Sequence, residues 1–167
     1  IEEFKNVEVK YGNNHDYLSM NLNFKDNGTC DVKMTNYIEK LIKENGIYAK
    51  AATPASNDIF QIDENSENLN IKEKEKFHTT VAQLLYIATR VRPDILLPTI
   101  FLTSRVQQPK VHDVKKLIRV LCYLNDTKYM GMTLGGDMSG NIRLYGAADS
   151  AFGVHPAKMR SQSGLLL

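Results

Sequence analysis

Apolar and polar residues alternate along several stretches in the first third of the chain. The alternation covers residues 4–10 and, most clearly, residues 17–24, and it returns at residues 30–34. A period of two residues is typical of a β-strand with one buried face. The intervening turn, residues 25–28, ends in Asn-Gly, a pair that favours hairpins. The pattern therefore predicts a small antiparallel sheet at the start of the chain.

The apolar spacing then changes to that of amphipathic helices. The first helix is expected over residues 35–44, with Gly46 as its stop. A second begins near residue 74 and is broken at Arg92-Pro93, where a further apolar segment starts. Another helix is expected over residues 111–124. Its inward-facing residues should be Val114, Leu117, Ile118, Leu121 and Leu124.

Two further strands, residues 129–134 and 141–148, complete the pattern and are expected to pair as a hairpin. Residues 51–72, which are rich in Asn, Asp, Glu and Ser, are expected to form a mobile linker. The sequence thus predicts an α+β fold, in which a small antiparallel sheet is followed by a helical segment and a closing β-hairpin.

Composition narrows the class of protein. Hydrophobic residues make up 43% of the chain and charged residues 24%, as in a soluble globular protein. No apolar run approaches the roughly 18 residues that cross a membrane, so no membrane partner is expected. Cys30 and Cys122 lack metal-ligand spacing, and we interpret them as free thiols in a reducing compartment, cytoplasmic or nuclear.

The two ends of the sequence suggest that it is incomplete. The chain begins at Ile1, and residues 164–167 form an apolar run that resembles a strand cut in the middle. We therefore expect a piece of a longer polypeptide.

Charge is unevenly distributed. Residues 1–76 carry 10 Lys and Arg against 14 Asp and Glu, whereas residues 77–167 carry 11 against 5. A basic second half suggests contact with a polyanion. The outer face of the predicted helix 111–124 is expected to hold the candidate nucleic-acid-binding residues Lys115, Lys116, Arg119 and Tyr123. Such an array follows phosphates without reading sequence, and an ordinary solvated helix surface is the alternative.

Short motifs along nearly the whole chain resemble those of one family. They are Tyr17-Leu-Ser-Met20, Ala52-Thr-Pro54, Leu84-Leu-Tyr86, Arg92-Pro-Asp-Ile95, Leu102-Thr-Ser-Arg105, Arg119-Val-Leu-Cys-Tyr-Leu124 with Thr127, and Gly146-Ala-Ala-Asp-Ser-Ala-Phe-Gly153 with Arg160-Ser-Gln-Ser-Gly164. In this order and spacing they resemble the reverse transcriptase–ribonuclease H part of copia-type retrotransposon polyproteins. Three residues depart from the family pattern: Ser19 replaces a glycine, Cys122 a common arginine, and Ala151 a frequent second aspartate.

The resemblance implies four parts. Residues 1–50 would be the end of the palm, with a primer-grip-like hairpin, and the first thumb helix. Residues 51–72 would be the linker, residues 73–128 the helical thumb and connection, and residues 129–167 the truncated start of a ribonuclease H-like domain. For the first part, an ordinary half-buried hairpin explains the alternation equally well.

The resemblance also limits the chemistry. Nucleotide addition in this family uses paired aspartates that hold two metal ions, and this sequence contains no Asp-Asp pair. Asp149 matches the first catalytic carboxylate of ribonuclease H, whose other carboxylates would lie beyond residue 167. Mg²⁺ belongs to the intact parent enzyme, and Asp149 would bind it only if the missing carboxylates were supplied. No cofactor is expected for this chain.

Two functions fit this sequence. The first is a fragment of a retrotransposon RNA-directed DNA polymerase/ribonuclease H that positions template–primer duplex, links the two active sites and lacks catalysis of its own. Its partners would be RNA–DNA hybrid or duplex, bound weakly and without sequence preference, and the remaining polymerase and ribonuclease H domains. The alternative is a host-retained remnant that acts as a nucleic-acid- or protein-binding module, and a decayed copy without function is a third interpretation.

Overall fold

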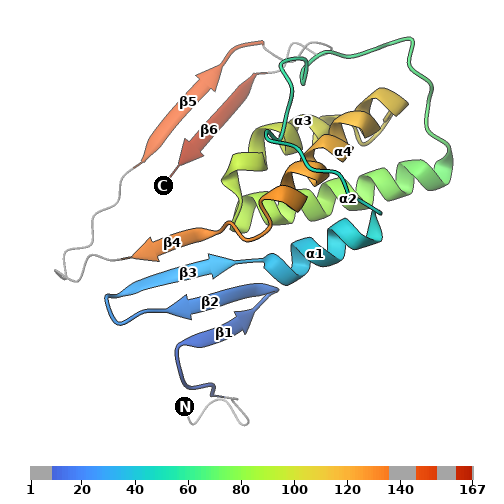
Figure 1. The fold of residues 1–167 in the computed structure, drawn as a ribbon. Coiled ribbons are helices and arrows are strands. Elements are labelled where there is room, and N and C mark those ends of the chain that lie inside the picture. Colours follow the sequence, from blue (N-terminus) through green and yellow to red (C-terminus); the bar gives the residue numbers. More distant parts are fainter. Residues whose placement is uncertain (1–8, 136–145, 154–160, 167) are drawn as a thin grey trace, which may run out of the picture.

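The chain folds as a four-stranded antiparallel sheet covered by helices, with a separate two-stranded ladder (Figure 1). The computed structural model describes residues 9–135, 146–153 and 161–166. The strands are β1 (Asn14–Tyr17), β2 (Met20–Phe24), β3 (Thr29–Lys33), β4 (Met132–Gly135), β5 (Ala147–Ala151) and β6 (Gln162–Leu166). The helices are α1 (Thr35–Glu44), α2 (Ile71–Arg90), α3 (Leu96–Arg105) and α4 (Val111–Asp126), with a 3₁₀ turn, η1, at Pro93–Ile95.

The alternating residues 17–24, predicted as one strand, form two strands joined by a tight turn. The chain reverses at Leu18 and Ser19, whose φ angles are 49° and 64°, so that Tyr17 of β1 pairs with Met20 of β2. Two-residue hairpin turns of this hand need positive φ at both central positions, which side chains other than glycine disfavour. The predicted β2–β3 hairpin is confirmed, and most of the strand predicted over residues 4–10 lies outside the described residues.

Ser19 stands where the resembling family has glycine, and the structure gives this departure a physical meaning. Replacing Ser19 by glycine is expected to raise the free energy of unfolding by about 0.5–1 kcal/mol. Glycine removes the cost of the left-handed conformation, about 1–2 kcal/mol. This gain exceeds the entropy that glycine adds to the unfolded chain. Thermal unfolding of the variant measures this change. Ser104→Gly, inside helix α3, is the control and should lose stability instead; an equal loss in both variants would contradict the strained turn.

The core lies between one face of the sheet and helices α1, α2 and α4. Its fully buried side chains include Met34, Ile38, Leu41, Phe77, Val81, Leu84, Ile87, Val120, Leu121 and Leu124. Helix α2 begins at a capping box, in which the Asn70 side chain accepts from the Glu73 N–H and the Glu73 carboxylate accepts from the Asn70 N–H, both at 3.0 Å.

Ile118 was expected to face inward, but it is 43% exposed. That prediction was wrong. Helix α4 buries the polar residues Asp113 and Lys116, whereas Ile118 lines an open groove.

Residues 51–70, called the connector below, lie against α4 and α3 rather than free of them (Figure 1). Ile59 is buried, and the rings of Phe60 and Phe101 meet edge to face at 5.7 Å. At the far end, the Leu69 N–H donates to the Pro109 carbonyl at 3.4 Å. The sequence-based expectation of a mobile linker did not anticipate these contacts, because composition alone does not show where a polar segment packs.

Strand β4 joins the first sheet. It pairs antiparallel with β3, with Val32 opposite Met132 and Thr29 opposite Gly135, while β5 pairs with β6. The predicted boundary at residue 129 would place β4 in a different part from β1–β3. In the structure, β4 belongs to the same sheet as these strands. Residues 141–145 of the predicted closing hairpin lie outside the described part of the chain. Within the described residues, no helix is long and apolar enough to cross a membrane.

Candidate nucleic-acid interface

Helix α4 carries the four predicted nucleic-acid-binding residues, but the structure exposes them unequally. Lys115 is exposed, whereas Lys116 is 6% exposed and lies under the connector. The Lys116 ammonium donates to the carbonyl of Ile59 at 2.8 Å and to that of Gln61, and it lies 4.7 Å from the centre of the Phe101 ring. The prediction that Lys116 belongs to an open outer face was wrong.

Arg119 and Tyr123 are half-buried and also engaged within the chain. The Arg119 Nη2 donates to the Thr53 hydroxyl at 2.8 Å, and the Tyr123 hydroxyl donates to Asp94 Oδ2 at 2.9 Å. The sequence predicted that α4 has one side covered by the core and one side open to solvent. The connector covers part of that second side, so Lys115 is the only one of the four predicted residues that is exposed.

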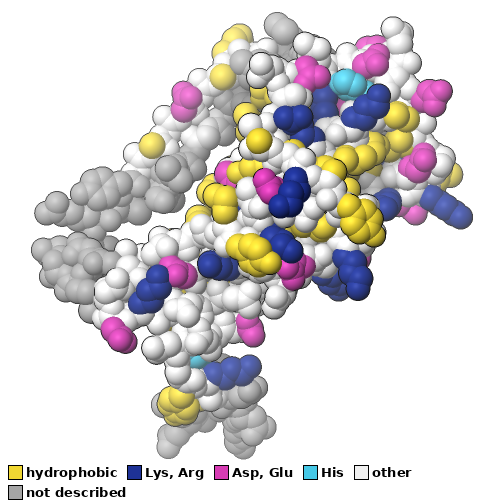
Figure 2. Space-filling view, in the orientation of Figure 1, with side chains coloured by type: hydrophobic (Ala, Val, Ile, Leu, Met, Phe, Trp, Pro, Cys, Tyr) yellow, Lys and Arg dark blue, Asp and Glu magenta, His cyan; other side chains and the backbone are white. Residues whose placement is uncertain are grey.

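On this face of α4, the Lys116 cation is buried beneath the acidic connector. Burial lowers the pKa of Lys116 from its ordinary value, and the carboxylates of Asp113 and Asp58 offset part of that effect. Hydrogen bonding from Ser56 lowers the pKa of Asp58, and the Lys116 charge contributes to the same direction. Figure 2 shows Lys and Arg side chains interspersed with Asp and Glu over the visible face, rather than gathered in one basic patch.

Asp149, the candidate catalytic carboxylate, lies in β5 opposite Gly164 and is exposed. Its Oδ1 accepts a hydrogen bond from the Ser150 N–H at 2.8 Å. Among the described residues, no group of three or more His, Cys, Asp or Glu side chains comes close enough to hold a metal ion. Whether Asp149 belongs to a two-metal site therefore stays a prediction.

Arg92, which the sequence marked only as part of a motif, anchors a buried polar cluster. Its side chain is 1% exposed, and its guanidinium donates to both carboxylate oxygens of Asp94, at 2.9 and 2.7 Å. It also donates to the backbone carbonyl and the hydroxyl of Thr127, at 2.8 and 2.7 Å. This bidentate geometry uses the planar fork that distinguishes arginine from lysine. The cluster ties η1 to the end of α4.

Tyr123 completes this cluster. Its ring centre lies 5.5 Å from the Arg92 guanidinium carbon, and its hydroxyl donates to the Asp94 carboxylate that Arg92 also binds. Burial raises the pKa of Tyr123, and the bond to Asp94 acts in the same direction. Burial also opposes ionisation of Asp94, but hydrogen bonds from Arg92 and Tyr123 outweigh it and lower the pKa. The Tyr123 hydroxyl is therefore engaged within the fold, where it connects α4 to Asp94 of η1.

Other motif residues make contacts of the same kind. The Tyr86 hydroxyl donates to the carbonyl of Leu18 at 2.6 Å and so holds the β1–β2 turn against α2. The Arg105 Nε lies 3.3 Å from each carboxylate oxygen of the buried Asp113. Two pairs of motifs far apart in sequence thus contact each other, through Tyr86 with Leu18 and through Arg92 with Thr127. Cys30 and Cys122 are free thiols, half-buried and buried, as predicted.

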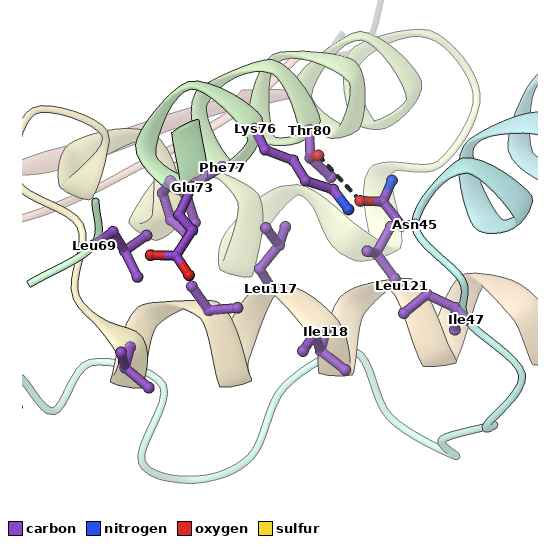
Figure 3. A pocket seen from close by; sticks show the side chains of 12 residues that line it. Asn45, Ile47, Leu69, Glu73, Lys76, Phe77, Thr80, Leu117, Ile118 and Leu121 are labelled. Atoms are coloured by element: carbon purple, nitrogen blue, oxygen red, sulfur yellow. Dashed lines mark hydrogen bonds between the residues drawn. The ribbon is translucent and has the colours of Figure 1, made fainter. Parts of the chain in front are cut away.

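An apolar groove of about 280 Å³ lies between α2 and α4 (Figure 3). Its lining includes the exposed Ile118, with Phe77, Leu117 and Leu121 at its floor. Glu73 and Lys76 contribute charged groups to the wall formed by α2. A hydrogen bond of 3.4 Å from the Thr80 hydroxyl to the Asn45 side chain also lies in the lining.

Comparison with known proteins relates this chain, by sequence, to a transposon protein. No protein-family profile matches the chain, and no solved structure matches it. A protein of Saccharomyces cerevisiae described as a transposon Ty5-1 protein is 29% identical over 116 residues. The match covers 68% of this chain and 37% of the yeast protein, so the chain spans little more than a third of that relative. The chain is thus related to a retrotransposon protein.

Proposed function

We propose that the chain is part of a copia-type reverse transcriptase/ribonuclease H polyprotein, in which it positions template–primer duplex and links the two active sites. One observation carries the proposal: the residues that resemble the family motifs contact one another. Arg92 and Asp94 meet Tyr123 and Thr127, and Tyr86 meets the turn at Leu18. A chain that keeps these pairs keeps the framework of the proposed parent, and this favours an intact module over a decayed copy.

The nucleic-acid surface in this proposal is α4. Lys115 is its exposed cation, and Lys116 and Arg119 lie on the same helix beneath the connector. Contacts of lysine and arginine with phosphates release counterions and carry no sequence information. The chain is therefore expected to bind RNA–DNA hybrid weakly, with strong dependence on salt and none on sequence.

The chain is not expected to catalyse either reaction of the proposed parent. In a two-metal site, Mg²⁺ stabilises the attacking and leaving oxygens of the phosphoryl transfer. Among the described residues, Asp149 belongs to no group of three or more His, Cys, Asp or Glu side chains that could hold a metal ion. The pure chain should show no Mg²⁺-dependent cleavage of a hybrid; cleavage that is lost in Asp149→Asn would contradict this expectation.

A salt series tests the proposed binding. Fluorescence anisotropy of a labelled RNA–DNA hybrid should give a log K that falls linearly with log salt. Lys115→Gln should weaken binding and reduce the slope by about 1. The matched control is Lys40→Gln, which removes an exposed lysine of α1, and it should leave the slope unchanged. Equal slopes for all three proteins would remove α4 from the interface, and no binding at low salt would sink the proposed function.

The groove between α2 and α4 favours a second candidate, a protein-binding module retained by a host. Ile118 and Val111 are exposed in its lining, where a partner could bury them. The genomic reading frame separates the two candidates. Continuation upstream into a Tyr-x-Asp-Asp motif and downstream into further carboxylate-bearing strands is expected for the polymerase fragment, and an isolated frame for the retained module.

A further inference from the structure

The connector and α4 have opposite charges where they meet. Residues 51–70 contain four acidic residues and no Lys or Arg. The acidic residues are Asp58, Asp63, Glu64 and Glu67. The segment of α4 beneath them presents Lys116 and Arg119, with Lys110 just before the helix. An acidic segment on a basic helix face resembles, in charge, the nucleic-acid backbone that the same face is proposed to bind.

Most polar contacts of the connector with α4 involve oxygen acceptors on the connector and nitrogen donors on or next to the helix; the Leu69 N–H, which donates to the Pro109 carbonyl, is the exception. Lys116 donates to two backbone carbonyls, and Arg119 donates to the Thr53 hydroxyl. The Lys110 ammonium lies 3.2 Å from the Glu64 carboxylate. The His112 N–H donates to the Ser66 hydroxyl at 3.0 Å. A phosphate oxygen could accept from each of the three cationic side chains.

Two side-chain nitrogens on this face lack a hydrogen-bond partner. Within the described residues, His112 Nε2 and Arg119 Nε are buried and have no hydrogen-bond partner. His112, Lys116 and Arg119 follow the spacing i, i+4, i+7 and therefore lie on one face of α4. The connector thus accepts two hydrogen bonds from the Lys116 ammonium and leaves one side-chain nitrogen of each neighbour without a partner. The Arg119 Nε–H is a buried donor without a partner, so a ligand that supplies an acceptor would be favoured there.

The ends and the middle of the connector are held by different contacts, and those of the middle are the Lys116 hydrogen bonds and the packing of Ile59 and Phe60. Before it, the carbonyls of Tyr48 and Ala49 accept from Asn125 Nδ2, at 3.3 and 3.0 Å. At its end, Asn68 forms a β-bridge with Lys110. The middle contributes the buried Ile59, which lies outside the main core cluster. Displacing the middle from α4 would break these contacts but would leave the main core cluster in place, because Ile59 is not part of it.

We propose that the connector is an intramolecular competitor of nucleic acid, which covers the His112–Lys116–Arg119 face in the free chain and leaves it when duplex binds. This proposal rests on the proposed function. The competition lowers the apparent affinity by the fraction of molecules in which the connector is displaced. Burial beneath the connector disfavours the charged form of Lys116, and displacement of the connector would remove this cost.

Three variants of the full chain test the competition, with a labelled RNA–DNA hybrid at low salt. The first replaces the four connector acids by their amides, Asp58→Asn, Asp63→Asn, Glu64→Gln and Glu67→Gln. Its matched control makes the same change in charge elsewhere, with Asp26→Asn, Glu39→Gln, Glu44→Gln and Glu75→Gln, all exposed residues. The third variant, Ile59→Ala, loosens the connector and leaves the charge unchanged.

The connector variant should bind hybrid about tenfold more tightly than the parent chain, and Ile59→Ala about threefold more tightly. The control should gain clearly less than the connector variant. Adding Lys116→Gln and Arg119→Gln to the connector variant should remove its gain. Equal gains in connector variant and control, or no gain with Ile59→Ala, would overturn the competition and leave the proposed function standing. Absence of hybrid binding in every variant would overturn both.

Discussion

Replacing Arg92 by alanine is expected to lower the free energy of unfolding by about 3 kcal/mol. Removing one partner of a buried ion pair costs about 3–5 kcal/mol, because the remaining charge loses its compensation. The lower end applies here, since the Asp94 side chain is 32% exposed and keeps some contact with water. Thr127 would lose two hydrogen bonds in the same variant. Chemical unfolding of parent and variant measures the difference.

Arg92→Lys is the matched control for this change. It keeps the charge and loses the bidentate fork, so its loss should be intermediate. The pH dependence gives a second readout. Because the pKa of Asp94 is lowered in the folded chain, its contribution is present above the unfolded pKa and disappears as pH falls through the folded pKa. Arg92→Ala should reduce this acid-sensitive part of the stability. An Arg92→Ala chain as stable as the parent would show that the cluster is not structural.

Replacing Gly131 by alanine is expected to detach β4 from the sheet. A Cβ at residue 131 would lie 2.3 Å from the carbonyl oxygen of Val32 and 2.7 Å from Lys33 Cγ. The nearer atom belongs to the backbone of β3 and cannot move aside without disturbing the pairing. The expected loss is about 2–3 kcal/mol, the upper part of the range for overpacking. Hydrogen exchange of Thr133 and its neighbours should accelerate.

Gly164→Ala is the control for the glycine replacement. A Cβ at residue 164 meets nothing within 4 Å, so this variant should remain as stable as the parent. If Gly131→Ala proved equally harmless, β4 would not be held against β3 as described. The test also bears on domain organisation, because it asks whether residues 132–135 depend on the sheet that begins at Asn14.

The sequence predicted the regular elements where the periodicity was strong. Helices α1, α2 and α4 and the β2–β3 hairpin lie close to their expected positions. The turn at Leu18 and Ser19 was missed because apolar alternation continues across it, and neither residue carries the glycine or asparagine signal of such a turn. The pairing of β4 with β3 was missed because strand periodicity does not identify a partner 100 residues away.

The candidate site was predicted less well than the fold. A lysine on an amphipathic helix is usually solvated, so Lys116 was assigned to the outer face. Its acceptors lie 55 and 57 residues earlier in the chain, in a segment without regular structure. Arg92 was noticed through its motif, but no local pattern indicated Thr127 as its partner. Whether Asp149 belongs to a ribonuclease H-like domain stays a prediction.

Hydrogen–deuterium exchange of the chain, with and without an RNA–DNA hybrid at low salt, tests the central claim most directly. The claim is that α4 forms a nucleic-acid interface, which the connector covers in the free chain. Exchange reports opening of individual segments. Hybrid should slow the amides of α4 and accelerate those of residues 58–67. Protection confined to other elements, or no change at a hybrid concentration that saturates binding, would contradict the account.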